Sequence, residues 1–170
     1  MNDHDVDLPR VDRATIGAIG EPGSRVFLFQ AQLEGEQFTF LIEKAHAVSL
    51  AQADRAMLVQ LGLPSDEPDW GEVALEVDGT QEPRWRVGHV DLTYDGDAKK
   101  VVLVLREAIL EDEVGRSARF FLTRGEFASV ARTGMEVATQ GRPICPHCGK
   151  PKDPDGHWCV ATNGHRKIQT

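Results

Sequence analysis

The three cysteines of this 170-residue chain all lie within its last 26 residues. Cys145 and Cys148 form a C-x2-C pair, and Cys159 follows a stretch rich in Pro, Gly and Asp that is typical of a turn. A C-x2-C turn presents two thiolates to one metal ion, and tetrahedral Zn²⁺ takes four thiolate or imidazole ligands. The spacing therefore predicts one zinc site, and it implies that the C-terminal segment forms a short fold stabilised by the metal.

Two histidines can supply the fourth ligand of this predicted site. His157 gives the pattern C-x2-C-x8-H-x-C, and it lies two residues before Cys159, so that both side chains face the same side of an extended strand. His165 gives C-x2-C-x10-C-x5-H and is the alternative. We expect His157, because it shares a short strand with another ligand. His147, between the first two cysteines, is expected to point away from the metal.

The ligand set predicts a structural zinc. Three cysteines and one histidine complete a tetrahedron and leave no position for water, whereas catalytic sites keep one open. A redox C-x-x-C pair opens a helix, and Pro146 and Gly149 in a Pro/Gly-rich tail argue against that arrangement. So short a tail buries little apolar surface, and we expect metal binding to supply its folding free energy, on the order of 10 kcal/mol.

The composition is that of a soluble protein, with 41% hydrophobic and 27% charged residues. No apolar run approaches the roughly 20 residues that cross a bilayer, so we expect no membrane partner. The N-terminal sequence MNDHDVDLPR is acidic and polar and does not resemble a signal or transit peptide. With clustered cysteines, these features favour the reducing cytoplasm over a disulfide-forming compartment.

Charge is distributed unevenly along the chain. The net charge is −8, but residues 141–170 contain five Lys/Arg and two Asp and carry +3, so the first 140 residues carry −11. An acidic body repels the phosphates of nucleic acid. The basic tail either meets an anionic partner or packs against its own acidic body.

Strand and helix patterns occur twice in the same order. The strand patterns fall at 14–19, 26–31 and 38–43 in the first part and at 87–92, 101–106 and 118–122 in the second. Each set is bounded by Gly, Pro and Asp turns and is followed by a helical pattern. We predict an α+β fold of two repeated β-β-β-α units that form antiparallel sheet with helices packed on it. The alternative is a coincidental similarity between two ordinary meanders.

These patterns divide the chain into a body and a tail. The predicted body spans residues 1–140, with halves at about 12–62 and 84–140 joined by a linker at 63–83, and the zinc-binding tail spans 141–170. Thr123 and Glu126 form a capping box that begins the second helix. The first helix begins at Lys44 if the repeat is followed, or at Ser49 by its own S-x-x-Q pattern.

Three other patterns suggest chemistry less specifically. Gly17, Gly20 and Gly23 give G-x-x-G-x-x-G, but a hairpin turn follows, so turn glycines explain it better than a phosphate site. His89 and Asp91 share one strand face, as an acid–base pair or, more simply, as surface residues. The run at 111–113 (Glu-Asp-Glu) is either a cation site or a solvated loop.

Five segments of the sequence form a recognisable set: G-R-P-I-C-P-H-C-G at 141–149, D-P-D-G-H-W-C at 153–159, N-G at 163–164, F-L-I-E-K at 40–44 and R-V-G at 86–88. In these segments the sequence resembles the uncharacterised actinobacterial family DUF3090. The family continues Cys-Pro-Arg after the third cysteine, whereas this chain has Cys159-Val160-Ala161, a change on the outer face of the knuckle. The resemblance implies a bacterial cytoplasmic zinc protein with no assigned activity.

Three classes of function remain at this point. We favour a non-enzymatic adaptor whose zinc knuckle binds a protein partner through His147, Lys150 and Trp158, since no nucleophile arrangement is readable and every cysteine is assigned to the metal. The second class is nucleic-acid binding through the basic tail. The third is a small-molecule enzyme with a cleft between the two halves, using His89 and Asp91.

Overall fold

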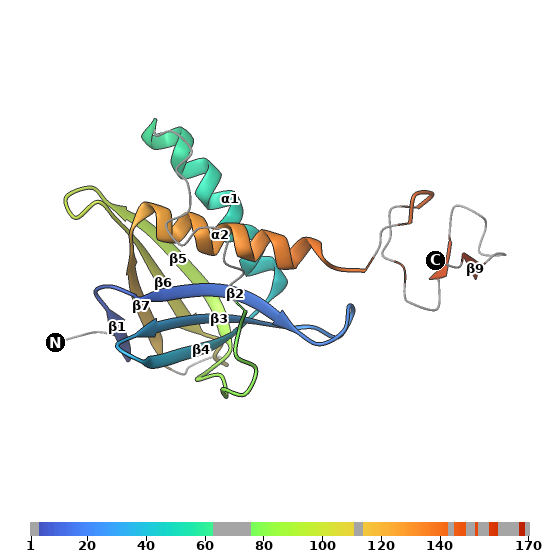
Figure 1. The fold of residues 1–170 in the computed structure, drawn as a ribbon, viewed down its shortest axis with the longest axis horizontal. Helices are drawn as coiled ribbons and strands as arrows, with labels where there is room; N and C mark the ends of the chain where they lie inside the picture. The colour runs from blue at the N-terminus through green and yellow to red at the C-terminus, as the bar shows by residue number, and fades with distance from the viewer. Residues whose placement is uncertain are drawn as a thin grey trace.

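The structure is a computed structural model that describes residues 4–62, 76–110, 114–142, 145–148, 152, 157–159 and 167–168. Its strands are β1 (Val6–Leu8), β2 (Arg13–Ile19), β3 (Val26–Leu33), β4 (Glu36–Ile42), β5 (Val87–Asp95), β6 (Lys100–Glu107), β7 (Ser117–Leu122), β8 (His157–Trp158) and β9 (Lys167–Ile168). The helices are α1 (Lys44–Leu61) and α2 (Arg124–Thr139). The predicted α+β class is confirmed (Figure 1).

Strands β2, β3 and β4 form an antiparallel sheet in that order, with β3 in the middle. A two-residue turn joins β3 to β4, and both of its residues, Glu34 (φ 54°) and Gly35 (φ 85°), are left-handed. This conformation matches the twist of a hairpin. The carboxylate of Asp12 accepts the Glu34 N–H at 2.6 Å, which stabilises the non-glycine residue in the turn.

The second sheet has the order β1-β7-β6-β5. Strands β5, β6 and β7 are antiparallel, as predicted, but the N-terminal strand β1 adds to β7 in parallel. No strand was predicted at β1, and the prediction of antiparallel sheet missed both this parallel pair and the division into two sheets. Three residues are too few for an alternating pattern to be recognised.

The two sheets share one hydrophobic core. Phe29 and Phe40 of the first sheet contact Phe120 of β7, with ring centroids 5.2 and 5.8 Å apart. Trp85 packs edge-on against Phe40 at 4.9 Å. Such edge contacts are the favoured arrangement of aromatic rings. A main-chain hydrogen bond also links the first sheet to the segment that leads into β5: Leu41 of β4 donates its N–H to the Trp85 carbonyl at 3.0 Å.

The starts of both helices agree with patterns in the sequence. At α2 the predicted capping box is confirmed: the Glu126 N–H donates to the Thr123 hydroxyl at 3.1 Å, and the Thr123 N–H donates to the Glu126 carboxylate at 2.7 Å. Helix α1 begins at Lys44, the earlier of the two predicted starts. Its end is marked by Gly62, which is left-handed with φ 61°.

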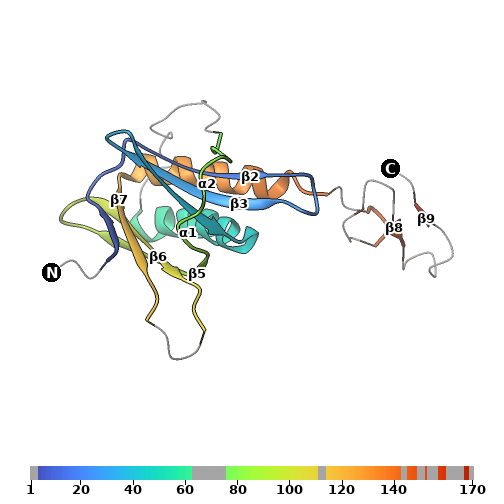
Figure 2. The same ribbon diagram turned by 90° about the horizontal axis from the view of Figure 1, so that it is seen from below.

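Helix α2 runs alongside β2, the edge strand of the first sheet, and α1 packs against α2 (Figures 1 and 2). Gly134 makes this close approach possible, since a Cβ there would lie 3.1 Å from the Ile16 side chain and 3.5 Å from Ala47. The helix of the second half thus packs on a strand of the first. The β-β-β-α order occurs in both halves, while their origin by duplication and the division at residue 140 stay predictions.

Candidate metal centre

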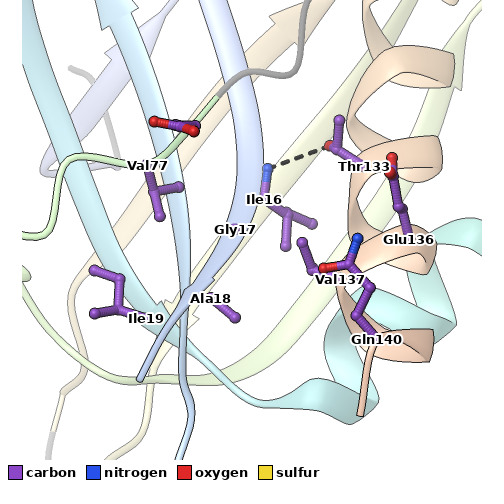
Figure 3. A pocket seen from close by; sticks show the side chains of 10 residues that line it. Ile16, Gly17, Ala18, Ile19, Val77, Thr133, Glu136, Val137 and Gln140 are labelled. Carbon is purple, nitrogen blue, oxygen red and sulfur yellow. Dashed lines mark hydrogen bonds between the residues drawn. The ribbon is translucent and has the colours of Figure 1, made fainter. Parts of the chain in front are cut away.

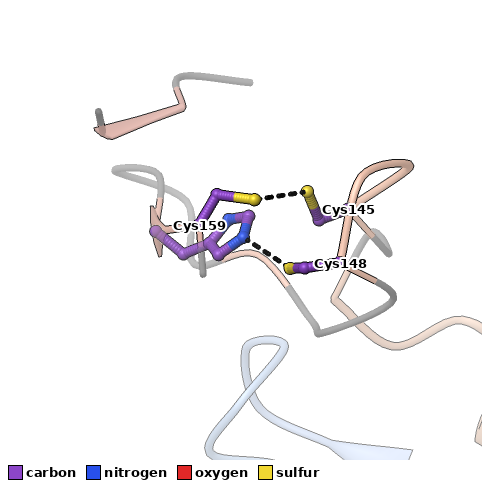
Figure 4. A group of neighbouring side chains, drawn as sticks. Cys145, Cys148 and Cys159 are labelled. Atoms are coloured by element: carbon purple, nitrogen blue, oxygen red, sulfur yellow. Dashed lines mark hydrogen bonds between the residues drawn. The ribbon is translucent and has the colours of Figure 1, made fainter. Parts of the chain in front are cut away.

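Four side chains of the C-terminal segment converge on one point. The Sγ atoms of Cys145, Cys148 and Cys159 and a ring nitrogen of His157 all lie within 4.8 Å of one another. Figure 4 shows the three cysteine side chains directed toward one another. Cys145 and Cys148 flank the turn that follows α2, while His157 lies on β8 and Cys159 directly after it.

The spacing of the donor atoms fits a tetrahedral ion. The Sγ atoms of Cys145 and Cys159 are 3.9 Å apart, and the Cys148 Sγ lies 3.3 Å from the His157 Nε2. Zinc–sulfur bonds of about 2.3 Å in a tetrahedron place neighbouring sulfurs about 3.8 Å apart. These two separations are close to what a shared tetrahedral ion requires, and the four donor atoms lie near enough to one another to hold a single metal ion.

The turn between the first two cysteines prepares Cys145 to act as a thiolate. Burial of Cys145 raises the pKa of its thiol and is the largest single effect, but the main-chain N–H groups of Cys148 and His147 donate to the sulfur and lower that pKa. The side chains of Cys148 and Cys159 contribute in the same direction, and the net shift is downward. A thiolate is the form that binds metal.

Strand β8 brings the second pair of donors into place. It pairs antiparallel with β9, His157 opposite Ile168 and Trp158 opposite Lys167. Because side chains alternate along a strand, His157 and Cys159 face the metal point while Trp158 faces outward. The Nε2 atom of His157 is directed at the cluster, and its Nδ1 atom is buried without a hydrogen-bond partner among the described residues.

The centre has a buried interior and an exposed rim. Cys145 and Cys159 are buried, whereas His147 is exposed and lies outside the cluster, as predicted. Trp158 has 62% of its surface exposed. His165, the alternative fourth ligand, and Lys150 lie outside the described residues.

Comparison with known protein families identifies the chain. The model of a family described as "protein of unknown function (DUF3090)" matches residues 6–159, which include the body and all four converging donors. The chain belongs to the DUF3090 family. No curated protein and no solved structure matches it significantly. Among the described helices of this DUF3090 member, none is long and apolar enough to cross a membrane.

Among the described residues of this DUF3090 protein, His89 and Asp91 form no comparable site. His89 and Asp91 do meet, with His89 Nε2 2.9 Å from the carboxylate, but Asp91 is also bound by Arg106 at 2.6 Å. The Arg106 hydrogen bond is the main reason why the pKa of Asp91 is lowered. The His89 side chain is 69% exposed, and neither residue is part of the pocket lined by β2 and α2. The contact between His89 and Asp91 is a hydrogen bond at the protein surface.

The glycine pattern also has a structural explanation, while the acidic run at 111–113 lies outside the described residues. Gly20 and Gly23 have φ values of 99° and 101° in the turn between β2 and β3, as turn glycines do. The described chain does contain a pocket that no motif predicted, between β2 and α2. Its walls come from segments far apart in the sequence, so no local spacing pointed to it.

Proposed function

We propose that this DUF3090 member is a non-enzymatic zinc-binding protein whose C-terminal knuckle engages a protein partner. The convergence of four metal-binding atoms within 4.8 Å carries the proposal. Zinc suits a set of three thiolates and one imidazole, and this set fills all four tetrahedral positions. The metal is therefore proposed to hold Cys145, Cys148, His157 and Cys159 together and to take no part in a reaction.

The exposed rim supports a role in binding a protein. Trp158 is mostly exposed beside two of the proposed ligands, and Pro146 and His147 are exposed on the turn of the first pair. Exposed aromatic residues on a rigid support are frequent anchors of protein interfaces. A bound zinc ion would supply that rigidity. We propose the cytoplasm as the location, because a reducing compartment keeps the thiols free to bind metal.

The metal is tested by elemental analysis of the purified full chain. We expect one zinc per chain, and we expect Cys145→Ser to lower the content to a small fraction because the proposed site loses a buried ligand. His147→Ala is the matched control, since His147 lies in the same turn outside the cluster, and it should retain the zinc. A chain that holds no zinc, or Cys145→Ser with full occupancy, would show the assignment to be wrong.

The partner is tested separately by affinity purification from the organism that encodes the chain. Proteins recovered with wild type should be lost with Trp158→Ala, while the zinc content of that variant stays at one per chain. Recovery of the same proteins with Trp158→Ala and Cys145→Ser would contradict the knuckle as the binding surface. A mobility shift with nucleic acid at low salt, lost when Arg142 and Lys152 are neutralised, would instead support the nucleic-acid alternative.

A further inference from the structure

A pocket of about 470 Å³ opens between β2 and α2. This size lies in the range of small-molecule sites, roughly 300–1,000 Å³. Figure 3 shows the residues of β2 on one side and those of α2 on the other. The pocket is lined by Ile16, Gly17, Ala18, Ile19, Glu76, Val77, Thr133, Glu136, Val137 and Gln140.

The pocket lies where the edge of β2 is uncovered. Among the described strands β2 pairs only with β3, so alternate residues direct their main-chain N–H and C=O groups away from the sheet. The N–H of Ile16 is one of these, because it reaches the Thr133 hydroxyl of α2 at 3.5 Å. Ala18 lies two residues further along β2, so its main-chain groups also point away from the sheet, and it lines the pocket. Helix α2 contacts β2 at Ile16, so no further strand can pair along the whole edge of β2. The space that remains beside Ala18 is large enough for a small ligand.

Glu76 and Val77 form a third wall of the pocket, and contacts with the first sheet hold them in place. Val77 lies over Gly17, where a Cβ would come within 2.6 Å of the valine methyl groups, so only glycine allows this approach. The main chain of Asp78 is bound on both sides by the Gln30 side chain, whose amide donates to the Asp78 carbonyl at 2.7 Å and whose oxygen accepts the Asp78 N–H at 2.8 Å. Glu76 and Val77 therefore form a wall that exists before any ligand binds.

The charge of the pocket is negative. Glu76 and Glu136 are its only charged lining residues, and neither carboxylate forms an ion pair within the described part of the chain. The guanidinium groups of Arg13 and Arg25 bind main-chain carbonyl oxygens, those of Glu76 and Val137. Both carboxylates are thus left to attract a cation, while Ile16, Val77 and Val137 supply apolar surface.

We propose that this pocket binds a small amphipathic cation, an organic amine or amidine with one apolar group. The cationic group would be held by a carboxylate of the lining, that of Glu76 or that of Glu136, with the Gln140 amide available as a further polar partner, and the apolar group would lie against the aliphatic floor. The described lining contains no His, Cys, Ser, Lys or Tyr side chain, so the proposal is one of binding and not of catalysis. It is independent of the zinc knuckle.

The test uses three probes of the same shape and different charge. Benzylamine, benzyl alcohol and benzoate are titrated into the ¹⁵N-labelled full chain, and amide shifts are followed by NMR. We expect benzylamine to shift the amides of Ile16, Ala18 and Gln140 in a saturable way. Benzyl alcohol should bind several-fold more weakly and benzoate not at all. Equal binding of the three probes, or no shift of the pocket amides at millimolar benzylamine, would overturn the proposal.

Charge-removing variants identify the carboxylates. Glu76→Gln and Glu136→Gln keep size and exposure, and each should weaken benzylamine binding about threefold, as exposed charge pairs are worth a fraction of a kcal/mol to about one. Glu82→Gln, an exposed glutamate outside the pocket, is the matched control and should bind like wild type. Cys145→Ser should also bind like wild type, which separates this site from the knuckle. A double Glu76→Gln and Glu136→Gln variant with undiminished binding would contradict the assignment.

Discussion

The side chain of Gln30 binds the main chain of Asp78 as a neighbouring strand would. Its amide oxygen accepts the Asp78 N–H at 2.8 Å, and its amide nitrogen donates to the Asp78 carbonyl at 2.7 Å and to the Thr39 hydroxyl at 3.1 Å. Gln30 is buried in the middle strand of the first sheet, so these bonds attach the chain that leads to β5 to the outer face of that sheet.

We expect Gln30→Ala to destabilise the protein by about 1–3 kcal/mol, because the Asp78 groups lose partners in a partly buried place. Amide exchange at Val77 and Asp78 should become faster, while exchange in β6 changes little. Gln30→Glu keeps the acceptor and removes the donor, and it should fall between wild type and Gln30→Ala in denaturant unfolding. Unchanged exchange at Asp78 in Gln30→Ala would show that other contacts fix this segment.

Arg124 and Asp54 join the two helices inside the protein. The Arg124 Nη1 lies 2.6 Å from the Asp54 carboxylate, and the side chains are only 9% and 16% exposed. Removing one partner of a buried pair leaves an uncompensated charge, so Asp54→Leu alone should cost about 3–5 kcal/mol in chemical unfolding. Arg124→Met combined with Asp54→Leu should be clearly more stable than Asp54→Leu alone. Additive effects in this double-mutant cycle would mean that the pair is not coupled.

Asp7 makes the stability of the β1 attachment dependent on pH. Arg119 of β7 donates two hydrogen bonds to the Asp7 carboxylate, at 2.6 and 3.0 Å, and these bonds are the main cause of its lowered pKa. A pKa that is lower in the folded state gives stability that is complete above the unfolded value, near 3.8, and is lost as the pH falls through the folded value.

We therefore expect Asp7→Asn to reduce the free energy of unfolding by about 1–3 kcal/mol at pH 7 and to have a smaller effect below pH 3.8. Urea unfolding across this range measures the difference. Asp97→Asn, in the exposed turn between β5 and β6, is the control, and its free energy of unfolding should stay close to that of wild type across the pH range. An effect of Asp7→Asn that is equal at all pH values would exclude the ion pair as its cause.

Features that depend on neighbouring residues were predictable from the sequence. The capping box of Thr123 and Glu126 and the six longer strands follow from short-range patterns, because caps and alternation are local properties. The four converging donors were predictable for the same reason: two lie in one tight turn, and the other two are two residues apart, one on β8 and one directly after it. The ligand spacing thus anticipated which side chains meet.

Features that join distant segments were not predictable. The pairing of β1 with β7 includes the contact of Asp7 with Arg119, 112 residues away in the sequence, and no local pattern in a three-residue strand marks it. Glu76 and Glu136 line one pocket because α2 packs alongside β2. His89 and Asp91 show the limit of local spacing, since it does place them in contact, while the exposure of His89, which supports the simpler interpretation as surface residues, comes from the fold. Burial is a property of the whole fold and is not encoded in the spacing of two residues.

The choice of fourth ligand can be decided by removing each histidine in turn. The Nε2 of His157 lies 3.3 Å from the Cys148 sulfur, at a position that a tetrahedral ion would bridge. We expect His157→Ala to lower the zinc affinity by more than about tenfold, since losing even an outer-shell partner costs that much. Chelator competition measures the affinity. In the cobalt-substituted protein, the absorption bands of tetrahedral Co²⁺ should weaken in the same variant.

His165→Ala is the matched control for this experiment, because it removes an imidazole from the same short tail. It should retain zinc affinity and the cobalt spectrum of wild type. The opposite outcome, with His165→Ala losing the metal and His157→Ala keeping it, would assign the fourth position to His165. In that case His157 would serve only as a residue of β8, and its contact with Cys148 would be a hydrogen bond between a thiol and an imidazole.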